Sequence, residues 1–145
     1  MTEPTTPQPN VMQIQVIALA VAFSNVVYAI VLVLLSKFSM PENGFLGEDA
    51  WPLDALAPLF LMLAVALVIV SFFVRRMMLP RVRGDLAAKL RLTLIGMALA
   101  DCAGVLGLLL CFTTGSLTWG LVLCAVGLAG AILHFPTRFW LEEDA

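Results

Sequence analysis

Residues 53–74 read LDALAPLFLMLAVALVIVSFFV, and this stretch, which Arg75 and Arg76 follow at once, decides the fold. An apolar α-helix needs about 20 residues to cross a hydrocarbon layer about 30 Å thick. The stretch has that length and contains no Lys or Arg. It therefore predicts a transmembrane helix that ends in two cations at the membrane surface.

Three further apolar runs are likewise free of Lys and Arg, at residues 11–36, 93–112 and 117–135. Spanning strands are not expected, because an open sheet edge cannot satisfy its backbone groups in lipid. We therefore predict an all-α fold, a membrane bundle of four transmembrane helices within residues 11–135. Pro80-Arg81 after the second run and Pro136-Thr137-Arg138 after the fourth form a short repeat, which predicts two parallel helical hairpins.

The composition agrees with a membrane protein and excludes a separate soluble domain. Of the 145 residues, 61% are hydrophobic and 12% are charged, and the mean hydropathy is +1.01. Soluble domains are about 45–50% apolar. The polar stretches between the apolar runs are each shorter than about 20 residues, too few to build a core. Any function must therefore lie within the membrane or at its surfaces.

The basic residues predict the orientation, because loops rich in Lys and Arg stay in the cytoplasm. Six of the eight lie between the second and third apolar runs, and they are Arg75, Arg76, Arg81, Arg83, Lys89 and Arg91. The connection before the second run is acidic, with a turn expected at Pro41–Gly44 and Trp51 as an interfacial anchor. We predict a protein of the cell membrane with both termini in the cytoplasm: a disordered tail at 1–10 and a short acidic tail at 136–145.

The basic connection should also end one helix and start the next. Pro80 removes a backbone donor and ends the second helix nearby, and Asp85 can cap the third. Leu90 on one side, with Lys89 and Arg91 on the other, predicts a short amphipathic lead-in along the headgroups. The cations act as a topology signal in this interpretation, and binding of anionic lipid is the alternative.

Asp101 is the ionisable residue deepest in any predicted span, and a charge there costs about 2.5 kcal/mol or more. Desolvation disfavours the carboxylate, so we expect the neutral acid at rest. Asn25 is its predicted partner, because the first and third helices cross in the same direction and both residues lie near the midpoints. Ser24 and Tyr28 offer further hydroxyls, although a helical serine often bonds its own backbone. Proton exchange and a purely structural bond both remain open.

Glycines at three- and four-residue steps mark close-contact faces on the last two helices. They are Gly96, Gly104, Gly107, Gly120 and Gly127. Packing within one hairpin is the main interpretation, and contact between protomers is the alternative.

Other reactive side chains suggest no catalytic site. His134 should anchor its helix at the interface rather than bind a metal, Ser71 and Thr93 lack partners, and all three cysteines lie in apolar runs as core thiols. Nothing pairs a nucleophile with a base or cradles a phosphate. We therefore predict no enzyme, no metal, no cofactor and no nucleic-acid partner.

Residues 98–108, ALADCAGVLGL, resemble the carboxylate-bearing helix of rotary ATP synthase subunit c over about one helix in four. Asp101 matches the ion-carrying acid of that family, Gly107 and Leu108 match its Gly-Leu pair, and Leu106 replaces its usual aromatic residue. The resemblance implies that Asp101 is the proton-binding carboxyl of an oligomeric membrane assembly.

From these observations we predict a non-enzymatic subunit or scaffold of a membrane assembly, which contacts the lipid bilayer and forms homo- or hetero-oligomers with other membrane proteins. The alternative is a proton-linked carrier, or a proton-translocating protein similar to subunit c, that uses Asp101. The subunit or scaffold function is favoured, because transport would need more than one buried acid without an evident polar cavity.

Overall fold

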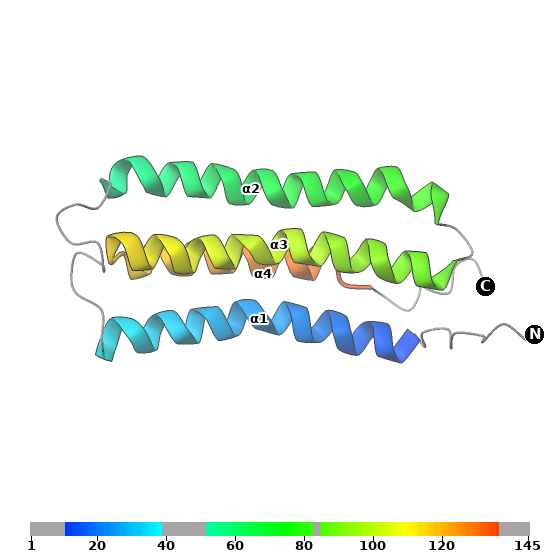
Figure 1. Ribbon diagram of the computed structural model, residues 1–145, viewed down its shortest axis with the longest axis horizontal. Helices are drawn as coiled ribbons and strands as arrows, with labels where there is room; N and C mark the ends of the chain where they lie inside the picture. The colour runs from blue at the N-terminus through cyan, green and yellow to red at the C-terminus, as the bar shows by residue number, and fades with distance from the viewer. Residues whose placement is uncertain (1–10, 39–51, 83–84, 137–145) are drawn as a thin grey trace, which may run out of the picture.

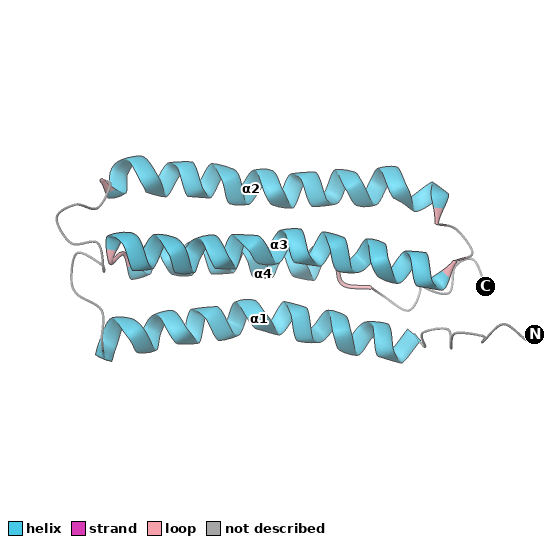
Figure 2. Ribbon diagram, viewed as in Figure 1, coloured by secondary structure: helices cyan, strands magenta, loops and turns pink. Residues whose placement is uncertain are grey.

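The computed structural model describes residues 11–38, 52–82 and 85–136. They form four α-helices and one 3-10 turn (Figure 1), namely α1 (Val11–Phe38), α2 (Leu53–Met78), η2 (Leu79–Arg81), α3 (Leu86–Thr114) and α4 (Leu117–Leu133). The residues that the structure describes contain no strand (Figure 2). The predicted all-α fold of four helices is therefore confirmed.

Three of the four helices are long and apolar enough to cross a membrane, over Met12–Phe38, Ala55–Arg81 and Ala87–Thr114. The fourth, α4, is equally apolar but has only 17 residues. At 1.5 Å per residue it is about 26 Å long, near the lower limit for a spanning helix. It ends two residues before the predicted limit at 135, and His134 is its C-terminal cap.

The helices form a bundle with α3 and α4 at its centre. These two pack against each other, α1 packs against both, and α2 packs mainly against α3 (Figure 1). The helices α1 and α3 run in one direction, while α2 and α4 run in the other. The start of α1, the end of α2, the start of α3 and the end of α4 therefore share one end of the bundle, which we call the basic end.

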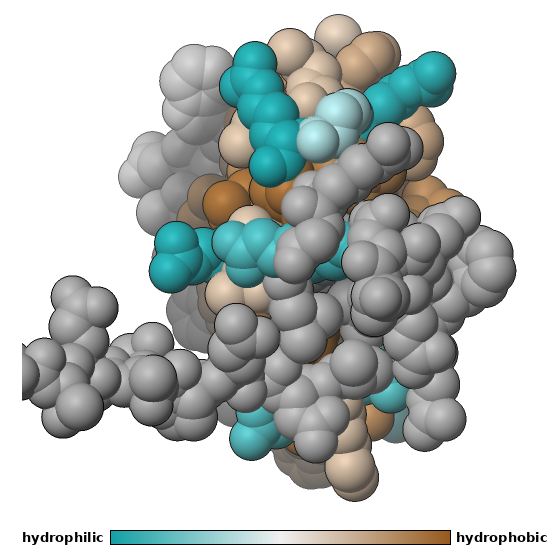
Figure 3. Space-filling model, turned by 90° about the vertical axis from the view of Figure 1, so that its right-hand side faces the viewer, coloured by the Kyte–Doolittle hydropathy of each residue, from teal (hydrophilic) through white to brown (hydrophobic). Residues whose placement is uncertain are grey.

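Hydrophilic side chains are visible at the basic end among hydrophobic ones (Figure 3). The end of α2, the turn η2 and the start of α3 carry the cations there, namely Arg75, Arg76, Arg81, Lys89 and Arg91. At the opposite end, α3 and α4 are joined by a short turn. Gly115 there has φ 71°, and its amide donates to the Cys111 carbonyl at 2.8 Å. Only glycine adopts this left-handed conformation without strain, so the turn folds α4 back along α3.

Asp85 caps α3 as predicted. Its Oδ1 accepts hydrogen bonds from the Ala87 amide at 2.9 Å and from the Ala88 amide at 3.1 Å. The predicted lead-in runs into α3, which is continuous from Leu86, but it is wrong in one respect, because Lys89 is only 4% exposed. Position 89 lies on the same helical face as the buried Thr93, which turns Lys89 inward while Arg91 stays exposed.

Large apolar side chains cover the outside of the bundle, most of all on α2. Met62 is 72% exposed and Phe73 is 58% exposed. Monomeric soluble proteins rarely expose large continuous apolar patches, whereas lipid tails are as apolar as these side chains. The exposed surface of α2 therefore agrees with a helix that faces lipid.

Several predictions concern residues outside the described ranges. They are the tail at 1–10, the turn at Pro41–Gly44, the Trp51 anchor, Arg83 and the tail beyond Pro136.

Candidate functional site

Asp101 lies half-buried in the middle of α3 and meets three polar side chains, all from α1. Asn25 Nδ2 donates to its Oδ1 at 2.9 Å, and the Tyr28 hydroxyl donates to its Oδ2 at 3.1 Å. The Ser24 hydroxyl also contacts Oδ1. The structure thus brings together all four polar residues that the sequence singled out, and we call them the Asp101 cluster.

The cluster forms because α1 and α3 run the same way and place these residues at one depth. Residue 28 lies four positions after residue 24 and three after residue 25, so all three side chains can reach the contact with α3. Ser24 also bonds its own backbone, as expected, through the carbonyl of Val21 three residues earlier. The same hydroxyl therefore has two acceptors.

Two glycines make room for Asn25, which is only 1% exposed. A Cβ atom at Gly104 of α3 or at Gly127 of α4 would collide with Asn25 Oδ1. That oxygen has no hydrogen-bond partner among the described residues. A buried polar atom without a partner costs about 1–3 kcal/mol. The notch between the two glycines therefore fixes the amide with its Nδ2 directed at Asp101.

The remaining predicted glycines also meet neighbours within the chain. A Cβ atom at Gly107 would lie 2.6 Å from the Gly120 carbonyl oxygen, so these two residues let α3 and α4 approach closely. A Cβ atom at Gly96 would press on the ring of His134. All five glycines thus meet neighbours of the same chain. Gly96 and Gly107 pack within the α3–α4 hairpin, whereas Gly104 meets side chains of α1, outside the hairpin that the main interpretation named.

No cation takes part in the Asp101 cluster. The hydrogen-bond partners of the carboxyl in the described part of the chain are a hydroxyl, an amide and a phenol. The cluster lies along the line of contact between α1 and α3, and the neighbouring Cys102 is exposed. The prediction of three core thiols is therefore wrong for Cys102, because it points outward with Ala98 and Val105, while Cys111 and Cys124 are buried.

A second polar cluster, around His134, lies nearer the basic end. His134 is 1% exposed, its Nδ1 lies 2.8 Å from the Gly130 carbonyl oxygen, and its Nε2 lies 3.2 Å from Ser71 Oγ. The Ser71 hydroxyl also contacts the Val68 carbonyl at 2.7 Å. We call these residues the His134 cluster, and it joins α4 to α2 beside Gly96 of α3.

The His134 cluster corrects two predictions, since His134 is not an interfacial anchor and Ser71 does not lack a partner. Position 134 continues the buried face of α4 that includes Gly127 and Ala131, and Ser71 continues the buried face of α2 that includes Ala64. These three-, four- and seven-residue steps were a usable signal in the sequence. Thr93 bonds the Lys89 carbonyl of its own helix at 3.0 Å.

The end of α4 is held by two further side chains. Arg75 Nη1 of α2 donates to the Leu133 carbonyl at 3.1 Å, and Gln15 Nε2 of α1 lies 3.5 Å from the Pro136 carbonyl. A cation suits this position, because the last carbonyls of a helix carry partial negative charge. Arg75 therefore stabilises the short helix α4 at the basic end.

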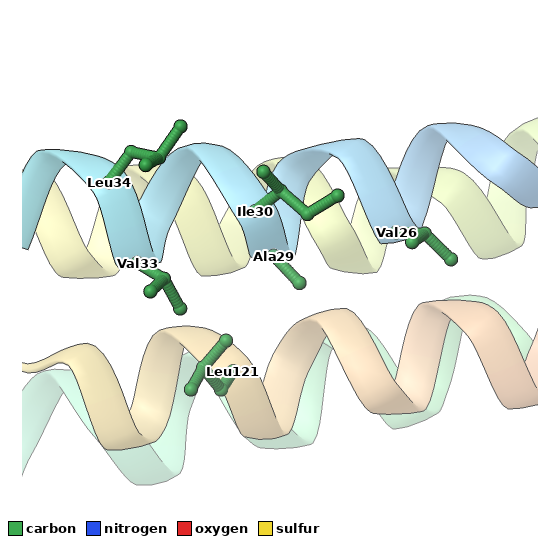
Figure 4. Close-up of a pocket in the computed structure, with 6 residues that line it drawn as sticks. All are labelled: Val26, Ala29, Ile30, Val33, Leu34 and Leu121. Atoms are coloured by element: carbon green, nitrogen blue, oxygen red, sulfur yellow. The ribbon is translucent and has the colours of Figure 1, made fainter.

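An apolar groove of about 290 Å³ lies between α1 and α4. It is lined by Val26, Ala29, Ile30, Val33, Leu34 and Leu121. Ala29 and Val33 point across it towards Leu121 (Figure 4). These aliphatic side chains offer no polar group to a substrate. The described residues also contain no group of three or more His, Cys, Asp or Glu side chains that could hold a metal ion.

Comparisons with known proteins assign no family to the chain. No family model, no curated protein and no solved structure matches it. The chemistry of the Asp101 cluster, with one acid and three uncharged partners, is proton binding and hydrogen bonding.

Proposed function

We propose that this chain is a small proton-linked protein of the cell membrane, in which Asp101 takes up and releases one proton inside the helix bundle. The observation that carries the proposal is the set of three uncharged side chains from α1 around a single carboxyl. The proposal needs no catalytic residue, metal or cofactor. It also keeps the predicted orientation, with both termini in the cytoplasm.

Two opposing effects act on the Asp101 carboxyl. Removing a carboxylate from water costs several kcal/mol in real proteins, which favours the neutral acid. Hydrogen bonds to a charged group are worth about 1.5–3 kcal/mol each, and three donors can serve the carboxylate. Burial thus favours the neutral acid, and the three donors favour the carboxylate. A cation in the cluster would have favoured the carboxylate alone.

A second candidate function is a non-enzymatic subunit or scaffold of a membrane assembly. One observation favours it: among the described residues, the hydrogen-bond partners of the Asp101 carboxyl all belong to α1, so a permanently neutral acid would tie α1 to α3. In this case the carboxyl would need only its polarity and shape. The lipid bilayer and other membrane proteins would then be its partners.

Replacement of Asp101 by Asn separates the two candidates. We expect a hydrophobic carbodiimide to label Asp101 in liposomes at low pH and to label it less as the pH rises. We also expect that Asp101→Asn folds, shows no label and loses the proton flux that a pH-sensitive dye reports. An amide keeps the size of the carboxyl but does not titrate. Unchanged flux in Asp101→Asn would exclude the proton-linked function and favour the scaffold.

Asp85→Asn is the matched control for that experiment. Asp85 caps α3 outside the Asp101 cluster, and Asn caps a helix about as well as Asp does. We expect this variant to retain both the label on Asp101 and the proton flux. The orientation is tested separately with single cysteines at Asn43 and Gly84 in a chain without its native cysteines. Asn43 should react from outside and Gly84 from inside, and the opposite pattern would contradict the topology.

A further inference from the structure

We propose that the proton taken up by Asp101 sits on Oδ1, between this oxygen and Ser24, and that the Ser24 hydroxyl turns when the proton leaves. The inference rests on the proposed function and adds to it the atom that carries the proton. It also gives Ser24 a role of its own, as the positioning residue that keeps the carboxyl hydrogen-bonded in both states.

Ser24 has one hydroxyl proton but two oxygen neighbours. Its Oγ contacts the Val21 carbonyl oxygen and Asp101 Oδ1 at hydrogen-bonding distance. A hydroxyl donates one hydrogen bond and can accept others. If Asp101 is a carboxylate, the Ser24 proton lies in only one of these two contacts. In the other contact two oxygen atoms meet without a proton between them. If Asp101 carries a proton on Oδ1, that proton fills the second contact.

The contact with Tyr28 decides between the two carboxyl oxygens. The Tyr28 hydroxyl lies 3.1 Å from Oδ2, and Asn25 Nδ2 lies 2.9 Å from Oδ1. With the proton on Oδ1, Oδ2 is the carbonyl oxygen of the acid and accepts from Tyr28. With the proton on Oδ2, Ser24 would again have one proton for two acceptors. Placement on Oδ1 is therefore the arrangement that gives every contact one proton.

Release of the proton leaves all donors in use. The bond between Oδ1 and its proton breaks, the proton passes to water, and the electron pair stays on the carboxylate. The Ser24 hydroxyl then turns about its C–O bond from the Val21 carbonyl to Oδ1. The carboxylate now accepts from Ser24, Asn25 and Tyr28. The Val21 carbonyl lies inside α1, where the helix supplies an amide donor four residues later.

No charged neighbour competes with this exchange within the described part of the chain. The titratable groups near the cluster are Tyr28 on α1, Cys102 beside Asp101 on α3, and Cys124 on α4. Phenols and thiols are uncharged at neutral pH in their ordinary state. The cations of α2 and α3 lie towards the basic end, and Arg91 is ten positions, or about 15 Å, along α3 from Asp101.

Infrared spectroscopy of the full chain in liposomes tests the inference through the C=O stretching band of the protonated acid. The band of Asp101 is identified by its loss in Asp101→Asn. We expect Tyr28→Phe to move the band to higher frequency, because the carbonyl oxygen Oδ2 loses its only donor. Ser24→Ala should leave the band nearly in place, and Ser24→Thr, which keeps the hydroxyl, should reproduce the parent spectrum.

The possible failures are distinguishable. If the parent chain shows no Asp101 band at any pH, the proposed proton binding itself fails. If the band is present and titrates, but Ser24→Ala moves it upward and Tyr28→Phe does not, the proton sits on Oδ2 and only this inference is overturned. Each variant changes a few atoms in a half-buried contact, and its folding is checked by the helical circular dichroism signal.

Discussion

The Asp101 and His134 clusters contain the same hydrogen-bond arrangement in two different surroundings. In each, an ionisable side chain meets a serine whose hydroxyl also contacts the carbonyl three residues earlier, Ser24 with Val21 and Ser71 with Val68. The surroundings differ, because Asp101 is half-buried along the contact between α1 and α3, while His134 is 1% exposed between α2, α3 and α4.

The hydrogen bonds of the two clusters are alike, and the difference lies in how deeply each ionisable side chain is buried. A neutral imidazole donates from one nitrogen and accepts at the other. His134 can therefore donate from Nδ1 to the Gly130 carbonyl and accept at Nε2 from Ser71 when the Ser71 hydroxyl turns away from the Val68 carbonyl, just as Ser24 can turn between its two neighbours. His134 is enclosed between three helices, however, whereas Asp101 is half-buried and therefore more open to the surroundings. We therefore expect the His134 cluster to serve structure and the Asp101 cluster to exchange a proton.

Removal of the His134 ring should have the largest effect on stability and none on proton binding. His134→Ala leaves a cavity beside Gly96 and breaks the link between α4 and α2. Large-to-small changes in cores cost about 2–5 kcal/mol. We expect a loss of this order in the free energy of unfolding, measured in detergent micelles, with unchanged pH dependence of the label on Asp101.

Ile132→Ala is the control for that variant, because Ile132 is 61% exposed at the same end of α4 and its loss opens no internal cavity. Changes at such surface positions usually stay within about 0.5 kcal/mol. A shifted pH dependence in His134→Ala would show that the two clusters are coupled and would contradict the division between them.

A methyl group in the glycine notch should weaken the Asp101 cluster alone. Gly127→Ala would press a Cβ atom against Asn25 Oδ1 and lie 3.0 Å from the Ala100 carbonyl oxygen, which is backbone and yields little. Overpacking costs about 1–3 kcal/mol. We expect this loss in unfolding free energy together with weaker pH dependence of labelling, because the Asn25 amide is displaced. Ala129→Val on the exposed face of α4 is the control and should change neither measurement.

The bond between Asn25 and Asp101 should give a smaller, measurable coupling. Hydrogen bonds in membrane proteins average about 0.6 kcal/mol and reach about 1.7 kcal/mol in double-mutant cycles. We expect a coupling free energy in this range from the cycle of Asn25→Leu and Asp101→Leu, measured by unfolding. Strictly additive losses would mean that the 2.9 Å contact contributes nothing to stability.

The sequence predicted the Asp101 cluster better than the His134 cluster for a physical reason. A charge in lipid is costly, so Asp101 stood out, and the shared direction of the first and third helices placed Asn25 at its depth. The exact face of contact did not follow, because it depends on Gly104 of α3 and on Gly127 of a further helix, α4. His134 and Ser71 each look ordinary in their own helix, and only the packing of α2 on α3 and α4 brings them together.

The helices themselves were predicted from lipid requirements, and their ends were less accurate. The third apolar run begins at residue 93, whereas α3 starts at Leu86, directly after the cap that was predicted at Asp85. An apolar run is bounded by Lys and Arg, whereas the hydrogen-bonded backbone of a helix extends further, to a capping residue such as Asp85. The hydrophobic pattern therefore located the part of each helix in lipid rather than the whole helix.

The smallest effect compares the two serines directly, since Ser24→Ala and Ser71→Ala remove the same atom from the two clusters. For Ser71 we expect a loss of about 0.5–1.5 kcal/mol in unfolding free energy, the value of a neutral hydrogen bond, and no change in the labelling of Asp101. For Ser24 the carboxylate loses a stronger hydrogen bond than the neutral acid does, because hydrogen bonds to charged groups are the stronger ones. The loss favours the neutral acid, so labelling of Asp101 by the carbodiimide should persist to a higher pH in Ser24→Ala than in the parent chain. Equal pH profiles for the two alanine variants would mean that Ser24, like Ser71, serves structure alone.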